Sequence, residues 1–268
     1  MQKTEIIYTN FNKFSDHLAQ LGEAGVGNSI FSLGSESRYQ LQYIPFEHVN
    51  RDACLVVIGI TPGMNQLRLA YEAAKVGLNA NWGNEKTLKY IKQQGAFGGS
   101  AMRPNLLKML RHFDFERLLG IGDVTSLWGS NSHLLQTTSV VPHAAFKAGK
   151  MFAGSFDEVM RSRLLRECFE ESFLPTLAEL PPDAMYVGLG PCPLDALKWC
   201  ADRGLIKRSQ LLGAFCHPSS SGGSMTRYFL REVAKSDLKP KDPVRSRCDW
   251  LDEAYRMMSL NISQRLLA

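Results

Sequence analysis

Three short apolar runs in the sequence are each followed by a turn and then by a helical pattern. The runs are "CLVVIGI" (54–60), "MYVGLG" (185–190) and "LLGAFCH" (211–217). Each run is free of charge, which is typical of a strand that is buried on both faces. Because apolar strands that alternate with helices usually pair in parallel, we expect an α/β fold with a mostly parallel central sheet covered on both faces.

The segments between these runs carry the spacing of helices. Residues 64–77, directly after the turn "TPG", repeat apolar side chains every three or four positions. The helix after the second run is expected to end at Gly204, since glycine is favoured where a helix stops. A third helix, "MTRYFLREVAK", follows the last run. Further elements are expected at 134–141 (strand), 157–177 (helix) and 250–267 (helix).

Length and charge narrow the class of protein. A chain of 268 residues with 44% hydrophobic content can bury a substantial core, and we expect one domain, 1–268, with a helical insertion at about 64–94. The net charge of +5 suits a polyanion-binding face without requiring one. The first residues do not resemble a signal peptide, and "ACLVVIGI" is too short to span a bilayer. We therefore expect a soluble, cytoplasmic monomer that does not bind membranes.

The six cysteines are scattered and form no C-x-x-C pair. Zinc sites and iron–sulfur clusters usually need such pairs, so the sequence predicts reduced thiols, no metal and no cofactor.

The loops that follow the three runs share a composition suited to binding phosphate. They read "GITPGMNQ", "GLGPCP" and "HPSSSGGS". In an open parallel sheet the loops at the carboxyl ends of the strands converge and form a ligand crevice. Glycine and serine let backbone N–H groups approach an anion closely, helped by the helix that starts behind each loop. The sequence therefore predicts a crevice for a phosphate-bearing ligand.

The same loops resemble a known family. "VVIGITPGMNQ" and "AFCHPSSS" resemble the two signature motifs of the uracil-DNA glycosylase superfamily, and "GAFGGSAMRPNLLKML" (95–110) is similar to the family's aromatic segment. "MYVGLGPCPLDALKW" is similar to its internal strand, so the matches keep the family's order from about Val56 to Arg227. The resemblance implies a three-layer α/β/α sandwich with a mostly parallel four-stranded sheet. It also implies an enzyme that excises uracil or a related deaminated base from DNA.

The resemblance assigns roles to individual residues. His217 would donate a hydrogen bond to the base oxygen that gains negative charge, and the ring of Phe97 would stack under the flipped base. Alternative roles are a structural histidine and a packing aromatic residue. Thr61 and Asn65 would complete the catalytic group. The other predicted site residues are Gly59, Ile60 and Ser139 for the base, and Pro62, Gly63, Pro218, Ser219, Ser220 and Arg227 for the DNA phosphates.

Two positions depart from the family pattern. Family members commonly carry Asp or Asn where Thr61 stands, and a threonine cannot act as a base near neutral pH. Asn65, Gln66 and Asp123 are the nearest substitutes to consider. Several branches have Asn where Ser139 stands, and a hydroxyl reads a base edge less selectively than an amide. Two alternatives therefore stay open, namely a nucleic-acid-binding protein without activity and a nucleotide or nucleoside hydrolase.

Overall fold

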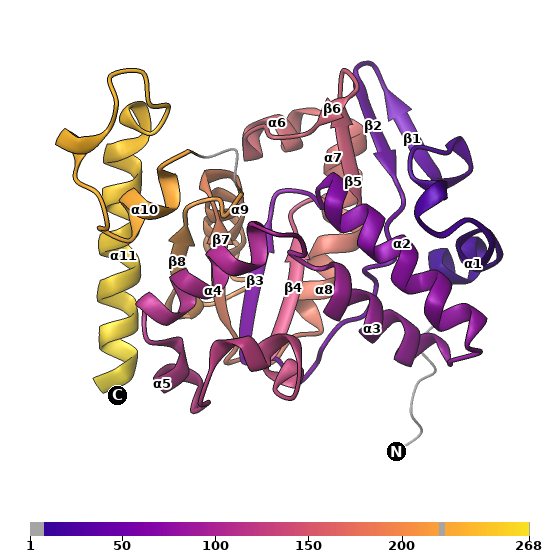
Figure 1. The fold of residues 1–268 in the computed structure, drawn as a ribbon, viewed down its shortest axis with the longest axis horizontal. Helices are drawn as coiled ribbons and strands as arrows, with labels where there is room; N and C mark the ends of the chain where they lie inside the picture. The colour runs from indigo at the N-terminus through magenta and orange to yellow at the C-terminus, as the bar shows by residue number, and fades with distance from the viewer. Residues whose placement is uncertain (1–7, 220–222, 268) are drawn as a thin grey trace.

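The apolar runs form neighbouring strands of one parallel sheet in the computed structural model, which describes residues 8–219 and 223–267 (Figure 1). The strand order is β4-β3-β7-β8, and every neighbouring pair is parallel. The strands are β3 (Leu55–Gly59), β4 (Leu135–Ser139), β7 (Met185–Leu189) and β8 (Leu211–Phe215). The predicted α/β class and the parallel sheet are confirmed.

Helices pack on both faces of this sheet. Leu55 and Val57 belong to a core cluster that includes residues of α4 and α11, whereas Val56 and Ile58 belong to a cluster that includes residues of α9. This alternation follows from the period of two along a strand, which sends successive side chains to opposite faces. The helices concerned are α4 (Met102–His112), α9 (Pro191–Asp202) and α11 (Cys248–Leu267).

A second, antiparallel sheet, which we did not predict from the sequence, has the order β1-β2-β5-β6. Its central pair joins residues far apart in the chain, with Tyr39 opposite Lys147. These strands are short and lack a continuous apolar run, so local patterning does not reveal them. They are β1 (Ser32–Glu36), β2 (Tyr39–Gln42), β5 (Ala144–Lys147) and β6 (Lys150–Met151).

Three helices form a further layer beside the second sheet. The expected insertion at 64–94 forms two helices that pack on each other, and the first of them also packs on α1. Leu18 of α1, Tyr71 of α2 and Leu88 of α3 lie together with Ala144 of the second sheet in a separate core cluster. The helices are α1 (Thr9–Leu21), α2 (Met64–Asn79) and α3 (Asn84–Gly95).

Two predicted helices differ from the observed ones. The segment expected as one helix at 157–177 is interrupted at Ser162, whose extended backbone ends α6 and whose side chain caps α7. The helix expected after β8 stops early, because Arg231 adopts a left-handed conformation with φ 63°. The observed segments are α6 (Phe156–Arg161), α7 (Arg163–Cys168), a π-turn (Phe169–Phe173), α8 (Leu174–Ala178) and α10 (Met225–Phe229).

Short helical turns complete the chain. One further short α-helix is α5 (Phe115–Leu119). Turns of 3-10 helix occur at Gly22–Gly25, Ser29–Phe31, Val124–Trp128, Ser132–Leu134, Arg208–Gln210, Lys235–Asp237 and Arg245–Arg247.

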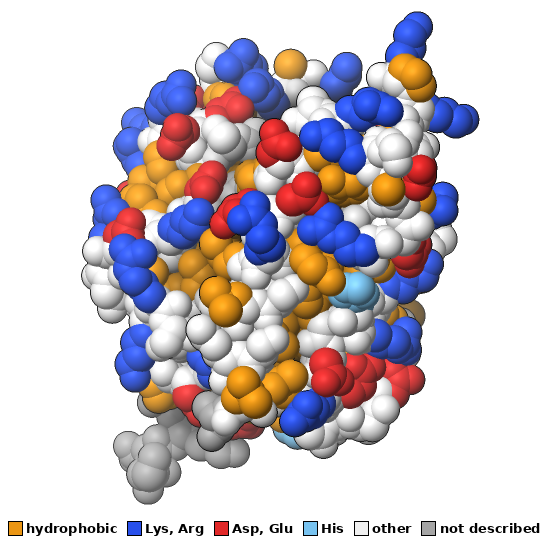
Figure 2. Space-filling model, turned by 90° about the vertical axis from the view of Figure 1, so that its left-hand side faces the viewer, with side chains coloured by type: hydrophobic (Ala, Val, Ile, Leu, Met, Phe, Trp, Pro, Cys, Tyr) orange, Lys and Arg blue, Asp and Glu red, His pale blue; other side chains and the backbone are white. Residues whose placement is uncertain are grey.

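The face that carries α11 bears charges of both signs. Basic and acidic side chains are interspersed there in Figure 2, and ion pairs join Arg231 to Asp252 and Lys235 to Asp249. No helix in the described ranges is both long enough and apolar enough to cross a lipid bilayer.

The strand order determines where the loops meet. The chain leaves β3 toward β4 on one side and leaves β7 toward β8 on the other. Loops that diverge in this way open a crevice at the carboxyl ends of the two central strands. Of the predicted site residues, those at 59–65 lie at the end of β3, Ser139 ends β4, and those at 217–219 follow β8.

Candidate functional site

Gly59, Phe97 and Ser139 meet at the end of β3. A Cβ atom placed on Gly59 would lie 3.3 Å from Cε1 of Phe97 and 3.3 Å from Oγ of Ser139. Together with Pro62, Phe97 and Ser139 line a cavity of about 20 Å³, which we call the Phe97 cavity. Ile60 instead packs against the core cluster on the α9 side. Three of the four predicted base-binding residues are thus brought together, and a side chain at position 59 would have to displace Phe97 or Ser139 by a few tenths of an ångström.

Phe97 has a strained backbone that its neighbours hold in place. Its φ of 49° lies in the left-handed region, which is unfavourable for an aromatic residue. The backbone N–H of Phe97 donates to Oε1 of the buried Gln66 at 2.9 Å. Arg103 donates to the carbonyl of Ala96 at 2.9 Å. Strain of this kind persists where surrounding contacts enforce it, and it is concentrated at functional sites.

The imidazole of His217 is oriented by its own loop. Its Nδ1 lies 2.9 Å from Oγ of Ser219 and accepts from the Ser219 backbone N–H at 3.4 Å. Because Nδ1 accepts a hydrogen bond, the proton of the neutral ring lies on Nε2. Burial and the charge of Arg247 lower the pKa of His217. The side chain is therefore a neutral Nε2–H donor near pH 7.

The loops after β3 and β8 face each other across a second cavity. Gly63, Asn65 and Ser219 line this cavity of about 230 Å³, together with the loop 98–102, and we call it the β3–β8 cleft. Asn105 on α4 donates to the carbonyl of Pro218 at 2.9 Å and anchors the loop. Gln66 lines both the cleft and the Phe97 cavity. Among the described residues that line the cleft or the Phe97 cavity His217 is absent, and its link to the cleft is the contact of its ring with Ser219.

Thr61 occupies a structural position. Its hydroxyl donates to the carbonyl of His143 at 2.6 Å and accepts from the backbone N–H of Ala145 at 2.9 Å. These two hydrogen bonds hold the turn against the start of β5. The Thr61 hydroxyl therefore cannot donate its proton to a bound water molecule. Asp123 does not replace it, because its carboxylate accepts hydrogen bonds from Arg111 and from the backbone N–H of Thr125 rather than from the turn.

The predicted phosphate-binding residues occupy different environments. Gly63 and Ser219 line the β3–β8 cleft, whereas Pro62 and Pro218 are buried and shape the loops. Arg227 is exposed on α10, and its Nε lies 3.7 Å from Oε2 of Glu232. Ser220 lies outside the described residues.

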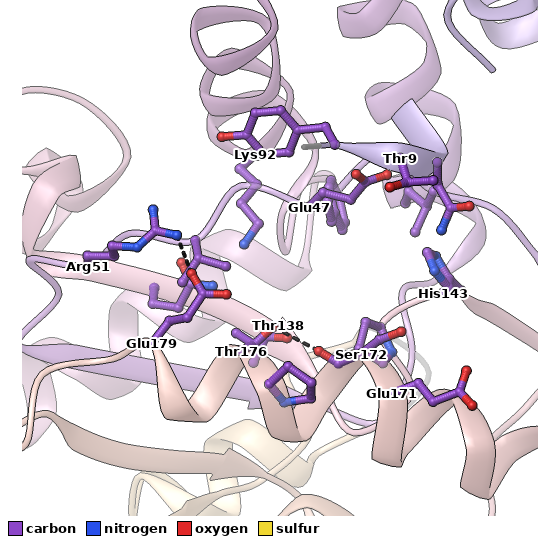
Figure 3. A pocket seen from close by; sticks show the side chains of 18 residues that line it. Thr9, Glu47, Arg51, Lys92, Thr138, His143, Glu171, Ser172, Thr176 and Glu179 are labelled. Atoms are coloured by element: carbon purple, nitrogen blue, oxygen red, sulfur yellow. Dashed lines mark hydrogen bonds and ion pairs between the residues drawn. The ribbon is translucent and has the colours of Figure 1, made fainter. Parts of the chain in front are cut away.

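A larger cavity, which the sequence did not suggest, lies along the free edge of β4 (Figure 3). Its volume is about 310 Å³, and its lining includes Lys92, Gln136 and His143; we call it the β4-edge cavity. Lys92 donates to the carbonyls of Thr137 and His48, and burial lowers the pKa of Lys92 to about 7. These residues come from separate segments with no common motif, so no sequence signal pointed to them.

Metal and thiol chemistry have little support in the described structure. No group of three or more His, Cys, Asp or Glu residues within 8–219 and 223–267 is arranged to hold a metal ion. Burial raises the pKa of the Cys192, Cys200 and Cys216 thiols to about 12. Thiols with such pKa values are poor nucleophiles at neutral pH.

Comparison with known proteins identifies a relative. No protein-family model matches the chain, and no solved structure matches it. The uncharacterized protein YoxB of Bacillus subtilis (strain 168) is 30% identical over 202 residues, which cover 75% of this chain and 78% of YoxB. Identity of this extent over most of both chains indicates common descent. The chain therefore belongs to the same family as the Bacillus subtilis protein YoxB.

Proposed function

We propose that this protein is a DNA glycosylase that hydrolyses the N-glycosidic bond of uracil or a related deaminated base in DNA, with the three-layer fold of the uracil-DNA glycosylase superfamily. One observation carries the proposal. Phe97 and Ser139 converge on Gly59, and Ser219 faces Gly63 across the adjoining cleft. These residues belong to separate segments of the chain, each selected by the sequence resemblance.

The first step is extrusion of the base from the duplex. The base stacks on the ring of Phe97 and presents its edge to the hydroxyl of Ser139. The Phe97 cavity of about 20 Å³ has room for about one water molecule. Base entry therefore requires the loop that carries Phe97 to shift.

Stabilisation of the departing base is the role of His217. The electron pair of the sugar–base bond leaves with the base, and negative charge develops on a base oxygen. The neutral Nε2–H of His217 donates to that oxygen, and Ser219 holds the ring in the required tautomer. Such a preorganised donor typically contributes about 3 to 4 kcal/mol to a reaction barrier.

Water then adds to the sugar carbon. Asn65 is exposed in the β3–β8 cleft and its amide can hold this water. Neither Asn65 nor the committed hydroxyl of Thr61 can remove a proton at neutral pH. Catalysis therefore relies on the leaving group, and the proton passes from the bound water to solvent or to the released base.

The lack of a proton-accepting side chain at Thr61 favours a second candidate function. A protein of this fold without a base at the turn can recognise an extruded base and leave its bond intact. That alternative predicts binding of damaged DNA with no abasic product.

An oligonucleotide panel tests both candidates. Labelled single and double strands that carry uracil, hypoxanthine or xanthine are incubated with the protein, and abasic sites are cleaved with alkali. We expect strand breaks at one or more of these bases. Binding without breaks for every base would reject the glycosylase and retain the binding protein. Release of base from free nucleosides, with none from DNA, would identify a nucleoside hydrolase.

A further inference from the structure

The segment between α10 and α11 carries much of the net charge of the chain. Residues 239–247 read KPKDPVRSR, and we call them the basic segment. Four basic side chains and one acidic side chain give the segment a charge of +3, against +5 for the whole chain. Such a density of one sign of charge is typical of a surface that binds a polyanion.

The basic segment is fixed to the protein core. Val244 and, just before the segment, Leu238 are buried in the core cluster that also contains residues of β8. The guanidinium of Arg245 donates to the carbonyl of Lys239 at 3.0 Å and to that of Leu238 at 2.6 Å. The carboxylate of Asp242 accepts from the backbone N–H of Val244 at 2.9 Å. The shape of the segment is therefore determined by the protein before a ligand arrives.

Three cations of the basic segment have no acidic partner among the described residues. Lys239, Lys241 and Arg247 are exposed, and none of them forms an ion pair with a residue that the structure describes. By contrast, Nζ of Lys235, just before the segment, lies 3.5 Å from Oδ1 of Asp249. An anion can therefore approach these three side chains without breaking a described ion pair.

The basic segment lies beside the loop that carries His217. A Cβ atom placed on Gly223 would lie 3.8 Å from Oδ1 of Asp242 and 3.9 Å from Cγ of Pro243. The segment is at the upper end of the molecule in Figure 1, where the chain also leaves β8. Besides burial, the charge of Arg247 lowers the pKa of His217. The basic segment thus flanks the loop that borders the β3–β8 cleft.

The chemistry of the basic segment favours phosphates over other anionic partners. Its valine is buried, and its exposed side chains are those of lysine, arginine, serine and proline. The segment therefore offers charge, but little apolar area for a protein surface or a lipid bilayer. A nucleic acid strand presents phosphates at regular intervals, and lysine and arginine are their usual partners.

We propose that the basic segment binds the phosphate backbone of the DNA strand whose base enters next to His217. The choice of DNA among polyanions rests on the proposed function. Lys239, Lys241 and Arg247 contact phosphates that flank the extruded nucleotide, and they read no sequence. These contacts add affinity and hold the strand in register with the β3–β8 cleft.

Fluorescence anisotropy of labelled duplex DNA at several salt concentrations tests the proposal. The main variant is Lys239→Ala/Lys241→Ala. Its matched control is Lys198→Ala/Lys207→Ala, which removes the same charge at two exposed lysines, one on α9 and one before β8 begins. We expect the main variant to bind at least about tenfold more weakly at low salt, and the slope of log K against log salt to fall by about 1.8. The control should match the wild type.

An RNA duplex of the same sequence is the second probe. We expect it to bind no more tightly than the DNA. Equal salt slopes in the wild type and the main variant, an equal loss in the control, or tighter binding of RNA than of DNA would overturn the proposal.

Base excision is measured on the same proteins to separate the two proposals. DNA binding that depends on the basic segment, without excision of any base, would retain the phosphate contacts and reject the glycosylase. Excision by a protein whose DNA binding is unchanged in the main variant would do the reverse.

Discussion

The β3–β8 cleft and the β4-edge cavity differ in how their polar groups are satisfied. Around the cleft, Thr61, Gln66 and His217 are all hydrogen-bonded within the protein, and their orientations are determined before any ligand arrives. In the β4-edge cavity, Gln136 and His143 each have a buried atom with no partner in the described structure. The cleft thus has polar groups that are already held by the protein, whereas the β4-edge cavity is lined by residues with unmet buried polar atoms in the described structure.

Loss of the imidazole in the cleft should have the largest effect. We expect His217→Ala to raise the activation free energy of single-turnover base excision by about 3 to 4 kcal/mol, because the donor to the departing base is removed. His133→Ala, at an exposed histidine on a 3-10 turn, is the control and should leave the rate unchanged. An unchanged rate in His217→Ala would remove this residue from the mechanism.

Lys92, which lines the β4-edge cavity, should make the free energy of unfolding depend on pH. The pKa of Lys92 is about 7 in the folded state against an ordinary value of 10.5, so between these values the unfolded chain binds a proton that the folded chain does not. The free energy of unfolding should therefore rise from about pH 7 to pH 9, by up to roughly 1.4 kcal/mol per pH unit. Chemical denaturation at several pH values measures the slope. Lys92→Met should abolish it, and a slope that persists in this variant would show that other groups cause it.

Substitution of Thr61 should change the stability of the protein much more than its excision rate. We expect Thr61→Val to lower the free energy of unfolding by about 1 to 3 kcal/mol, because the His143 carbonyl and the Ala145 N–H lose their partner. The excision rate should stay within a few-fold of the wild type at a temperature where both proteins are folded, and Thr61→Ser should restore stability. A large loss of rate in a folded Thr61→Val protein would instead give the hydroxyl a part in the chemistry.

The smallest effect is expected at Arg227, which is exposed on α10. Arg227→Ala removes an exposed charge and should reduce the salt dependence of DNA affinity by about one counterion. Arg256→Ala on α11 is the control. Equal slopes in the wild type and Arg227→Ala would place this side chain away from the DNA.

Much of the cleft could be predicted from the sequence. The continuous apolar runs indicated β3, β7 and β8, and their glycine, proline and serine loops pointed to Gly63 and Ser219. Such inferences succeed because burial on both faces leaves a local composition, and because the carboxyl ends of parallel strands share one edge.

The partners of these residues could not be predicted in the same way. The bonds from Thr61 to β5, the pairing of Tyr39 with Lys147 and the contact between Asn50 and Gln136 each join segments that are far apart in the chain. Periodicity and turn composition determined the type of each element and the loop that follows it. Only the tertiary structure decided which buried donors and acceptors meet. These contacts depend on how segments far apart in the chain pack together, and local sequence patterns do not encode the distance between such segments.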